Sequence, residues 1–126
     1  MKKLIFFITF FLYPLFSIDA QEQTNIADGA LLRGLDKVSG EVIDFGIKSG
    51  DTYSLWKLDI ELSECRYPVS NPVGDAFARL TISQGKSERD LFRGWMVASS
   101  PALNPLEHPR YDVWVLRCAM VSTSVE

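Results

Sequence analysis

The chain has 126 residues, of which 47% are hydrophobic and 23% are charged. These fractions are typical of one globular domain, and they exclude a disordered, collagen-like or coiled-coil protein. The formal net charge of −3 provides no basic field that could hold nucleic acid. We therefore expect no nucleic-acid partner.

The first twenty residues have the three-part layout of a secretory signal peptide. Lys2 and Lys3 form a short positive segment, residues 4–16 are largely apolar, and Ala20 is a small residue at the expected cleavage point. A membrane anchor is the alternative, but a bilayer span needs about 20 apolar residues and this run is shorter. We predict cleavage after Ala20, export to the periplasm and no stable membrane span afterwards.

Both cysteines, Cys65 and Cys118, lie in the part of the chain that we expect to be exported. An even count in an oxidising compartment favours a disulfide between them; two buried free thiols are the alternative. In a regular strand Cys65 would lie on the polar face. The bond therefore requires Cys65 to lie past the strand end, or a bulge near Glu64. Two cysteines and one distant histidine do not have zinc spacing, so we predict no metal site.

Apolar and polar residues alternate along much of the chain, and this period of two is typical of half-buried strands. The clearest run is 56–63, in which Trp56, Leu58, Ile60 and Leu62 alternate with polar residues. Further strand-like runs are 42–47, 76–83, 90–99 and 111–119. The last two runs are rich in aromatic and β-branched residues, which favours burial on both faces.

Turn signals separate these runs. They are Ser39-Gly40, residues 48–51, the proline-containing loop 66–75 and the polar turn 85–89. The pattern predicts an all-β fold, a small antiparallel β-sandwich or barrel of about six strands. The expected organisation is a signal peptide (1–20), a flexible lead-in (21–29), a single β domain (30–119) and a C-terminal tail (120–126).

The segment 99–109 differs from the rest because it carries prolines at 101, 105 and 109. Ser100-Pro101 resembles the start of a helix, but Pro105 limits any helix to one turn. We predict a rigid proline-rich loop, or a single helical turn, before the last strand. Rigid loops on a β scaffold commonly carry binding function. The alternative is structural, with Leu103 and Leu106 plugging one end of the sandwich.

Three blocks of sequence resemble the DUF2155 family, a domain of unknown function from alphaproteobacteria. They are residues 32–40 (LRGLDKVSG), residues 65–68 (CRYP) and the run FRGWMVASSPALNPLEHPRYDVWVLRC at 92–118. The resemblance covers about residues 30–118, and this chain departs from the family in its short C-terminal tail and at Asn104-Pro105. It implies a small exported domain and no particular reaction, cofactor or catalytic residue.

Two chemical constellations surround His108, the single histidine. A hydrolase would combine Ser100, His108 and Asp112, but no G-x-S-x-G motif is present, so we expect no enzyme activity. Glu107, His108 and Asp112 could contact a cation, but they lack a fourth ligand. We therefore expect neither a catalytic residue nor a cofactor.

Exposed aromatic rings could stack on a sugar or grip a protein. Strand parity assigns Trp56 and Trp114 to the core, whereas Trp95 and Tyr111 flank the proline-rich loop. The predicted binding surface comprises Trp95, Ser99, Ser100, Pro101, Asn104, Glu107, His108, Arg110 and Tyr111. We expect an exported, non-catalytic β domain of the bacterial envelope whose partner is an envelope protein or protein complex. The alternative function is a carbohydrate or cell-wall binding module.

Overall fold

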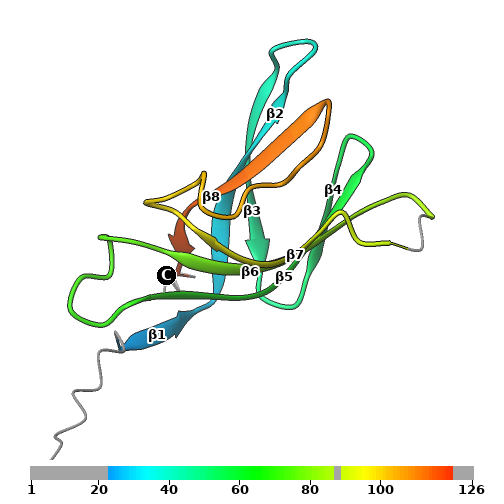
Figure 1. Cartoon of the computed structure of the whole chain (residues 1–126). Coiled ribbons are helices and arrows are strands. Elements are labelled where there is room, and N and C mark those ends of the chain that lie inside the picture. Colours follow the sequence, from blue (N-terminus) through cyan, green and yellow to red (C-terminus); the bar gives the residue numbers. More distant parts are fainter. Residues whose placement is uncertain (1–22, 87–88, 121–126) are drawn as a thin grey trace, which may run out of the picture.

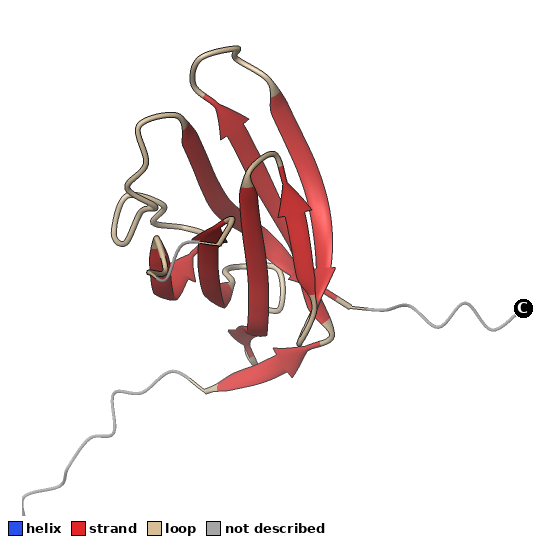
Figure 2. Ribbon diagram, turned by 90° about the vertical axis from the view of Figure 1, so that its right-hand side faces the viewer, coloured by secondary structure: helices blue, strands red, loops and turns tan. Residues whose placement is uncertain are grey.

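The computed structural model describes residues 23–86 and 89–120, and Figure 1 shows them as strands joined by turns and loops. The strands are β1 (Thr24–Ala27), β2 (Gly29–Asp36), β3 (Val42–Lys48), β4 (Thr52–Leu55), β5 (Leu58–Pro68), β6 (Phe77–Gln84), β7 (Phe92–Val97) and β8 (Tyr111–Ala119). Figure 2 shows no helix in this part of the chain. The predicted all-β class is confirmed, with two more strands than expected.

The strands form two antiparallel sheets that face each other as a sandwich. One sheet has the order β1-β5-β6-β7, with β4 also paired to β5, and the other has the order β3-β2-β8. Because β5 is 11 residues long, one of its edges accommodates two short strands. β4 pairs with its first four residues and β1 with its last four.

Side chains of both sheets fill the space between them. The most deeply buried are Leu58, Ile60 and Leu62 of β5, Ala78, Leu80 and Ile82 of β6, Ala30 and Leu32 of β2, and Val113 and Val115 of β8. They recur at every second position, so the predicted alternation along β5 and β6 is confirmed. β8 is buried on one face rather than both, and Trp114 lies half-buried on its other face, opposite Arg33 of β2.

A disulfide joins Cys65 of β5 to Cys118 of β8, and thereby the two sheets, with a Cα–Cα distance of 5.7 Å. Of the two alternatives that the sequence left open, the bulge is the one present: β5 continues past Cys65 to Pro68, and the β5–β6 register shifts between Leu62 and Glu64. This shift turns Cys65 into the core, where it is fully buried. A second irregularity, opposite Leu31–Leu32, changes the parity of β8 before Cys118.

The two predicted glycine turns are confirmed. Gly40 and Gly50 have φ angles of 77° and 89°, in the left-handed region that glycine tolerates without strain. The sequence did not predict the turn at Trp56-Lys57, which lies between β4 and β5. The expected continuous strand over 56–63 therefore begins only at Leu58.

The N-terminal part of the domain is more ordered than predicted. Thr24–Ala27, which we expected within a flexible lead-in, form β1 and pair with the end of β5. The chain then crosses to the other sheet at Gly29, where a Cβ would collide with the backbone of Ile47. The predicted signal peptide and residues 121–126 lie outside the described residues. Within the described ranges, no helix is long and apolar enough to cross a membrane.

Candidate binding site

The loop 98–110, which joins β7 to β8, is fixed at its start by Asp75. The Asp75 carboxylate accepts hydrogen bonds from the Ser99 backbone N–H (3.0 Å) and hydroxyl (2.7 Å). Further along, the Asn104 side-chain amide donates to the Trp95 carbonyl at 3.1 Å, and Leu106 is only 4% exposed. The loop is therefore held rigidly against the sandwich, as its prolines predicted.

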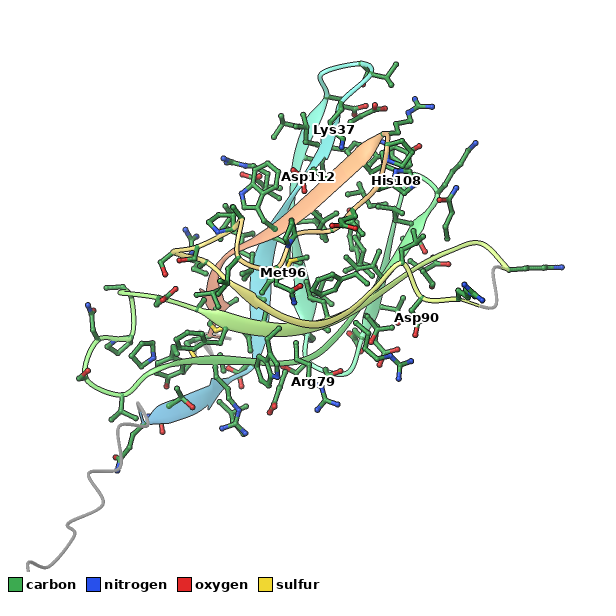
Figure 3. All side chains as sticks on the ribbon, viewed as in Figure 1. Lys37, Arg79, Asp90, Met96, His108 and Asp112 are labelled. Carbon is green, nitrogen blue, oxygen red and sulfur yellow. A yellow bond between two sulfur atoms is a disulfide. The ribbon has the colours of Figure 1, made fainter. Side chains whose placement is uncertain are left out.

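His108 fixes the other end of the loop. Its Nδ1 accepts hydrogen bonds from the backbone N–H groups of Arg110 and Tyr111, both at 3.0 Å. The proton must then reside on Nε2, which lies 2.9 Å from Oε1 of Gln84 and donates to it. The Lys37 ammonium donates to the His108 carbonyl at 2.6 Å, and Figure 3 shows both residues at one end of the molecule. Burial, and secondly the charge of Lys37, lower the pKa of His108.

Three rings form an aromatic stack at this end, namely Trp56, Tyr111 and His108. The ring centroids of Trp56 and Tyr111 are 5.1 Å apart with an interplanar angle of 10°. Those of Tyr111 and His108 are 5.0 Å apart at 24°. The Arg110 guanidinium lies 5.3 Å from the centre of the Tyr111 ring. The stack links the β4–β5 turn to the start of β8 and closes this end of the sandwich.

Trp56 occupies an unusual backbone conformation to reach the stack. Its φ angle is 54°, in the left-handed region that bulky residues rarely adopt. Gly34 of β2 makes room for the ring, since a Cβ there would lie 3.3 Å from the indole and closer still to Leu55. Packing against Tyr111 and over Gly34 is what holds Trp56 in this strained turn.

A buried carboxylate connects the β2–β3 turn to β8. Asp36 is 3% exposed, and it is the only buried charged residue in the described part of the chain. Its carboxylate accepts hydrogen bonds from Arg110 (Nη2–Oδ2 3.0 Å) and from the backbone N–H groups of Val38 and Ser39. The Arg110 guanidinium, helped by these backbone donors against the effect of burial, lowers the pKa of Asp36 to about 2. Arg110, predicted to face a partner, is engaged within the domain.

An open groove of about 510 Å³ lies beside the aromatic stack. It is lined by Ser54, Trp56, Lys57, Asp59, Gln84 and Gly85. The Ser54 hydroxyl donates to Oδ1 of Asp59 at 2.7 Å, which orders one wall. Trp56 is the single aromatic residue of this lining, and the other lining residues are polar apart from Gly85.

The residues predicted to form one binding surface are divided between two ends of β6. Asp75, which binds Ser99, precedes this strand, whereas Gln84, which binds His108, ends it. Eight strand residues span about 25 Å. One end therefore holds Trp95, Ser99, Ser100, Pro101 and Asn104. The other end holds His108, Arg110 and Tyr111. Glu107 is exposed and follows the buried Leu106 in the loop. Tyr111 is only 3% exposed, so its ring is part of the core rather than of the surface.

The same geometry separates the residues of the hydrolase alternative. Both ring nitrogens of His108 are bonded to other groups, and no hydrogen bond within the described residues joins it to Ser100 or Asp112. Asp112 follows the inward-facing Tyr111, so its side chain points to the opposite face of β8. In the ranges 23–86 and 89–120, no group of three or more His, Cys, Asp or Glu residues could hold a metal ion.

Sequence reasoning missed Trp56, Asp36 and Gln84 as members of the site. The alternation of 56–63 continues through the β4–β5 turn, and no glycine or asparagine marks it. Asp36 and Gln84 are single polar residues at strand ends, where polar residues are ordinary. Their partners lie 74 and 24 positions away, and such contacts leave no local signal.

The fold and the site define a class, that of small β-sandwich domains with disulfide-linked sheets and a long anchored loop. The chain belongs to the DUF2155 family, described as an uncharacterized protein conserved in bacteria, whose model matches residues 30–118. This match includes both cysteines and the whole loop. The chain is also similar to the uncharacterized protein RP359 of Rickettsia prowazekii (strain Madrid E). The two are 30% identical over 105 residues, which cover 81% of this chain and 67% of the relative. No solved structure matches the chain.

Proposed function

We propose that the protein is exported to the periplasm and acts there as a non-catalytic domain that binds an envelope protein or protein complex. The signal-peptide layout of residues 1–20 supports export. The Cys65–Cys118 bond supports it independently, because disulfides persist in oxidising compartments and are rare in the cytosol.

One observation supports protein binding above all: the rigid loop and the neighbouring strand β7 carry exposed apolar side chains. Leu103 of the loop is 74% exposed, and Trp95 of β7, whose carbonyl accepts a hydrogen bond from Asn104, is 38% exposed. A loop that is already ordered loses little conformational entropy on association. Tryptophan is among the residues that dominate binding energy at protein interfaces.

Affinity capture with matched variants tests this role. The tagged protein is cross-linked and captured from the envelope of the native bacterium, beside Trp95→Ala, Leu103→Ser and the control Val73→Ser. Val73 is 93% exposed in a different loop, so its replacement removes an exposed apolar side chain elsewhere. We expect Trp95→Ala and Leu103→Ser to remain folded, which thermal melting checks, and to capture the wild-type partner roughly tenfold less well, as loss of a hot-spot residue predicts. Full capture by both variants would contradict the proposal.

Export has its own test. N-terminal sequencing of the protein from a periplasmic extract should begin at or near Gln21. An intact Met1 in the membrane fraction would contradict both the cleavage site and the periplasmic location.

A further inference from the structure

The outer edge of β3 is an unpaired strand edge. Among the described strands, β3 pairs only with β2, at one end of the order β3-β2-β8. The Asp36 N–H donates to the Glu41 carbonyl, one step beyond the last pair of the β2–β3 ladder and in the same register. Since bonded and unbonded pairs alternate along an antiparallel ladder, the backbone N–H and C=O groups of Val42, Asp44 and Gly46 point away from β2.

This edge is open and regular. Within residues 23–86 and 89–120, no hydrogen bond uses the backbone groups of these three residues, and all three residues are exposed. β3 contains no proline, and its pairing with β2 has no register shift. β7, an edge of the other sheet, is instead capped by its own loop, because Asn104 and Ser100 donate to the carbonyls of Trp95 and Val97. An uncapped, regular edge is a template for one more strand.

A small pocket opens beside the β3 edge. Its volume is about 150 Å³, and it is lined by residues 28–30, residues 46–48 and Ala119. None of these residues belongs to the other sheet, so the pocket lies on the outer face of the β3-β2-β8 sheet. A Cβ at Gly46 would meet only the Ala30 carbonyl oxygen, at 4.0 Å, so the space over this glycine is open. A cavity of this size holds a benzene-sized ring.

A strand that pairs with β3 would fill this pocket from the side. Its residue opposite Gly46 would project on the same outer face, about 5 Å away, and a large apolar side chain there would cover the glycine. Lys48 lines the same pocket, and no hydrogen bond or ion pair within the described residues involves its ammonium group. An acidic residue opposite Lys48 would supply the missing partner.

We propose that the β3 edge binds an extended segment of another protein as an added antiparallel strand. The segment carries a large apolar residue opposite Gly46 and, two positions before it, an acidic residue opposite Lys48. Main-chain hydrogen bonds to β3 supply affinity, and the pocket supplies specificity. This site goes beyond the proposed role of the Trp95 end, because Trp95 of β7 lies in the other sheet.

A second copy of this chain does not suit the edge. Among the three open residues, Gly46 can face Val42, Asp44 or Gly46 of an antiparallel second copy. The first register places the two Asp44 carboxylates opposite each other, which is destabilising. The second register places a carboxylate over the pocket, and the third leaves the pocket empty. The occupant is therefore a strand of different sequence.

The probe is the blocked peptide Glu-Thr-Phe-Val-Thr-Thr-Ile, whose Phe would face Gly46 and whose Glu would face Lys48. It is added to protein produced from the full sequence and followed by NMR. The backbone amides of Val42, Asp44 and Gly46 should shift saturably and become protected from hydrogen exchange. The alternate amides of β3, already bonded to β2, are the internal control. A peptide with Gly in place of Phe should bind roughly tenfold more weakly, because no ring enters the pocket.

Variants test the edge and the pocket separately. Asp44→Pro deletes one edge N–H and places the proline ring where the added strand would lie. Asp44→Ser is its matched control, since both variants lose the ion pair with Arg33 but only the proline lacks the N–H. Gly46→Val places methyl groups in the pocket without a clash in the free domain. Asp44→Pro and Gly46→Val should each weaken peptide binding roughly tenfold or more, and Asp44→Ser should leave it within about twofold.

Thermal melting checks that each variant is folded, and Gly46→Val keeps the test decisive if Asp44→Pro does not fold. The proposal is overturned by the absence of saturable shifts up to about 1 mM peptide, by equal affinity of the glycine peptide, or by unchanged binding to Gly46→Val. Protection of the three edge amides that rises with protein concentration, without peptide, would assign the edge to a second copy instead. None of these results bears on capture of a protein by the Trp95 end, so the two proposals fail independently.

Discussion

Removing the disulfide by the double substitution Cys65→Ala and Cys118→Ala should destabilise the domain strongly. The two cysteines are 53 positions apart, and in the chain-entropy model a cross-link of that span stabilises the fold by about 4 kcal/mol. The bond also joins the two sheets covalently, through a sulfur at Cys65 that is fully buried. For a domain near 100 residues, about 4 kcal/mol corresponds to a fall in Tm of roughly 16 °C or more.

Guanidinium chloride unfolding at neutral pH measures this loss. The wild-type protein treated with a thiol reductant is the control, and it should unfold at the same denaturant concentration as the double variant. The m-value, which is the dependence of the free energy of unfolding on denaturant concentration, should increase in the variant because its unfolded chain is less compact. A double variant whose free energy of unfolding lies within about 1 kcal/mol of the oxidised wild type would refute the loop-closure reasoning.

Three further predictions concern the loop and the aromatic stack. Leu106→Ala should lower the free energy of unfolding by about 2–5 kcal/mol because Leu106 is buried, whereas Leu103→Ala should change it by less than about 0.5 kcal/mol; denaturant titration of both variants checks this contrast. Gly34→Ala should cost about 1–3 kcal/mol because its Cβ overlaps Leu55 and crowds the indole ring, and a Tm equal to that of wild type would contradict that packing. Folding lowers the pKa of His108 and so favours its neutral ring. The free energy of unfolding should therefore be highest above pH 6.5, the ordinary pKa of histidine, and should decline as the pH falls below that value. In a pH series of melting curves, His108→Gln should lack this decline.

The period-two pattern of the sequence predicted much of the fold because burial on one face of a strand directly selects apolar residues at every second position. The bounds of β8 coincide with the predicted 111–119, and the inward residues of β6 are those that the alternation marked. Glycine turns at Gly40 and Gly50 were also predictable, since a positive φ favours glycine locally. The Cys65–Cys118 pair followed from the count of cysteines and the expected compartment.

Tertiary packing alone decided where that pattern is interrupted. The turn at Trp56 has a positive φ but no glycine, because contact with Tyr111 and Gly34, distant in sequence, stabilises a conformation that the local residues disfavour. The bulge before Glu64 changes the face on which Cys65 lies. The sequence offered this bulge only as one of two ways to form the disulfide, because a shift of one residue in register leaves no local mark in a run of ordinary strand residues.

The sequence pointed to the loop of the candidate site, but it predicted neither all of the site's residues nor its shape. The prolines and aromatic residues pointed to the loop, and its rigidity follows from the local restriction of φ by proline. Its division between two ends depends on Asp75 and Gln84, which lie 24 positions before their partners Ser99 and His108. Hydrogen bonds between residues so far apart form only when β6 places its two ends at opposite sides of the sandwich, and that separation is a property of the packed strands rather than of any local sequence.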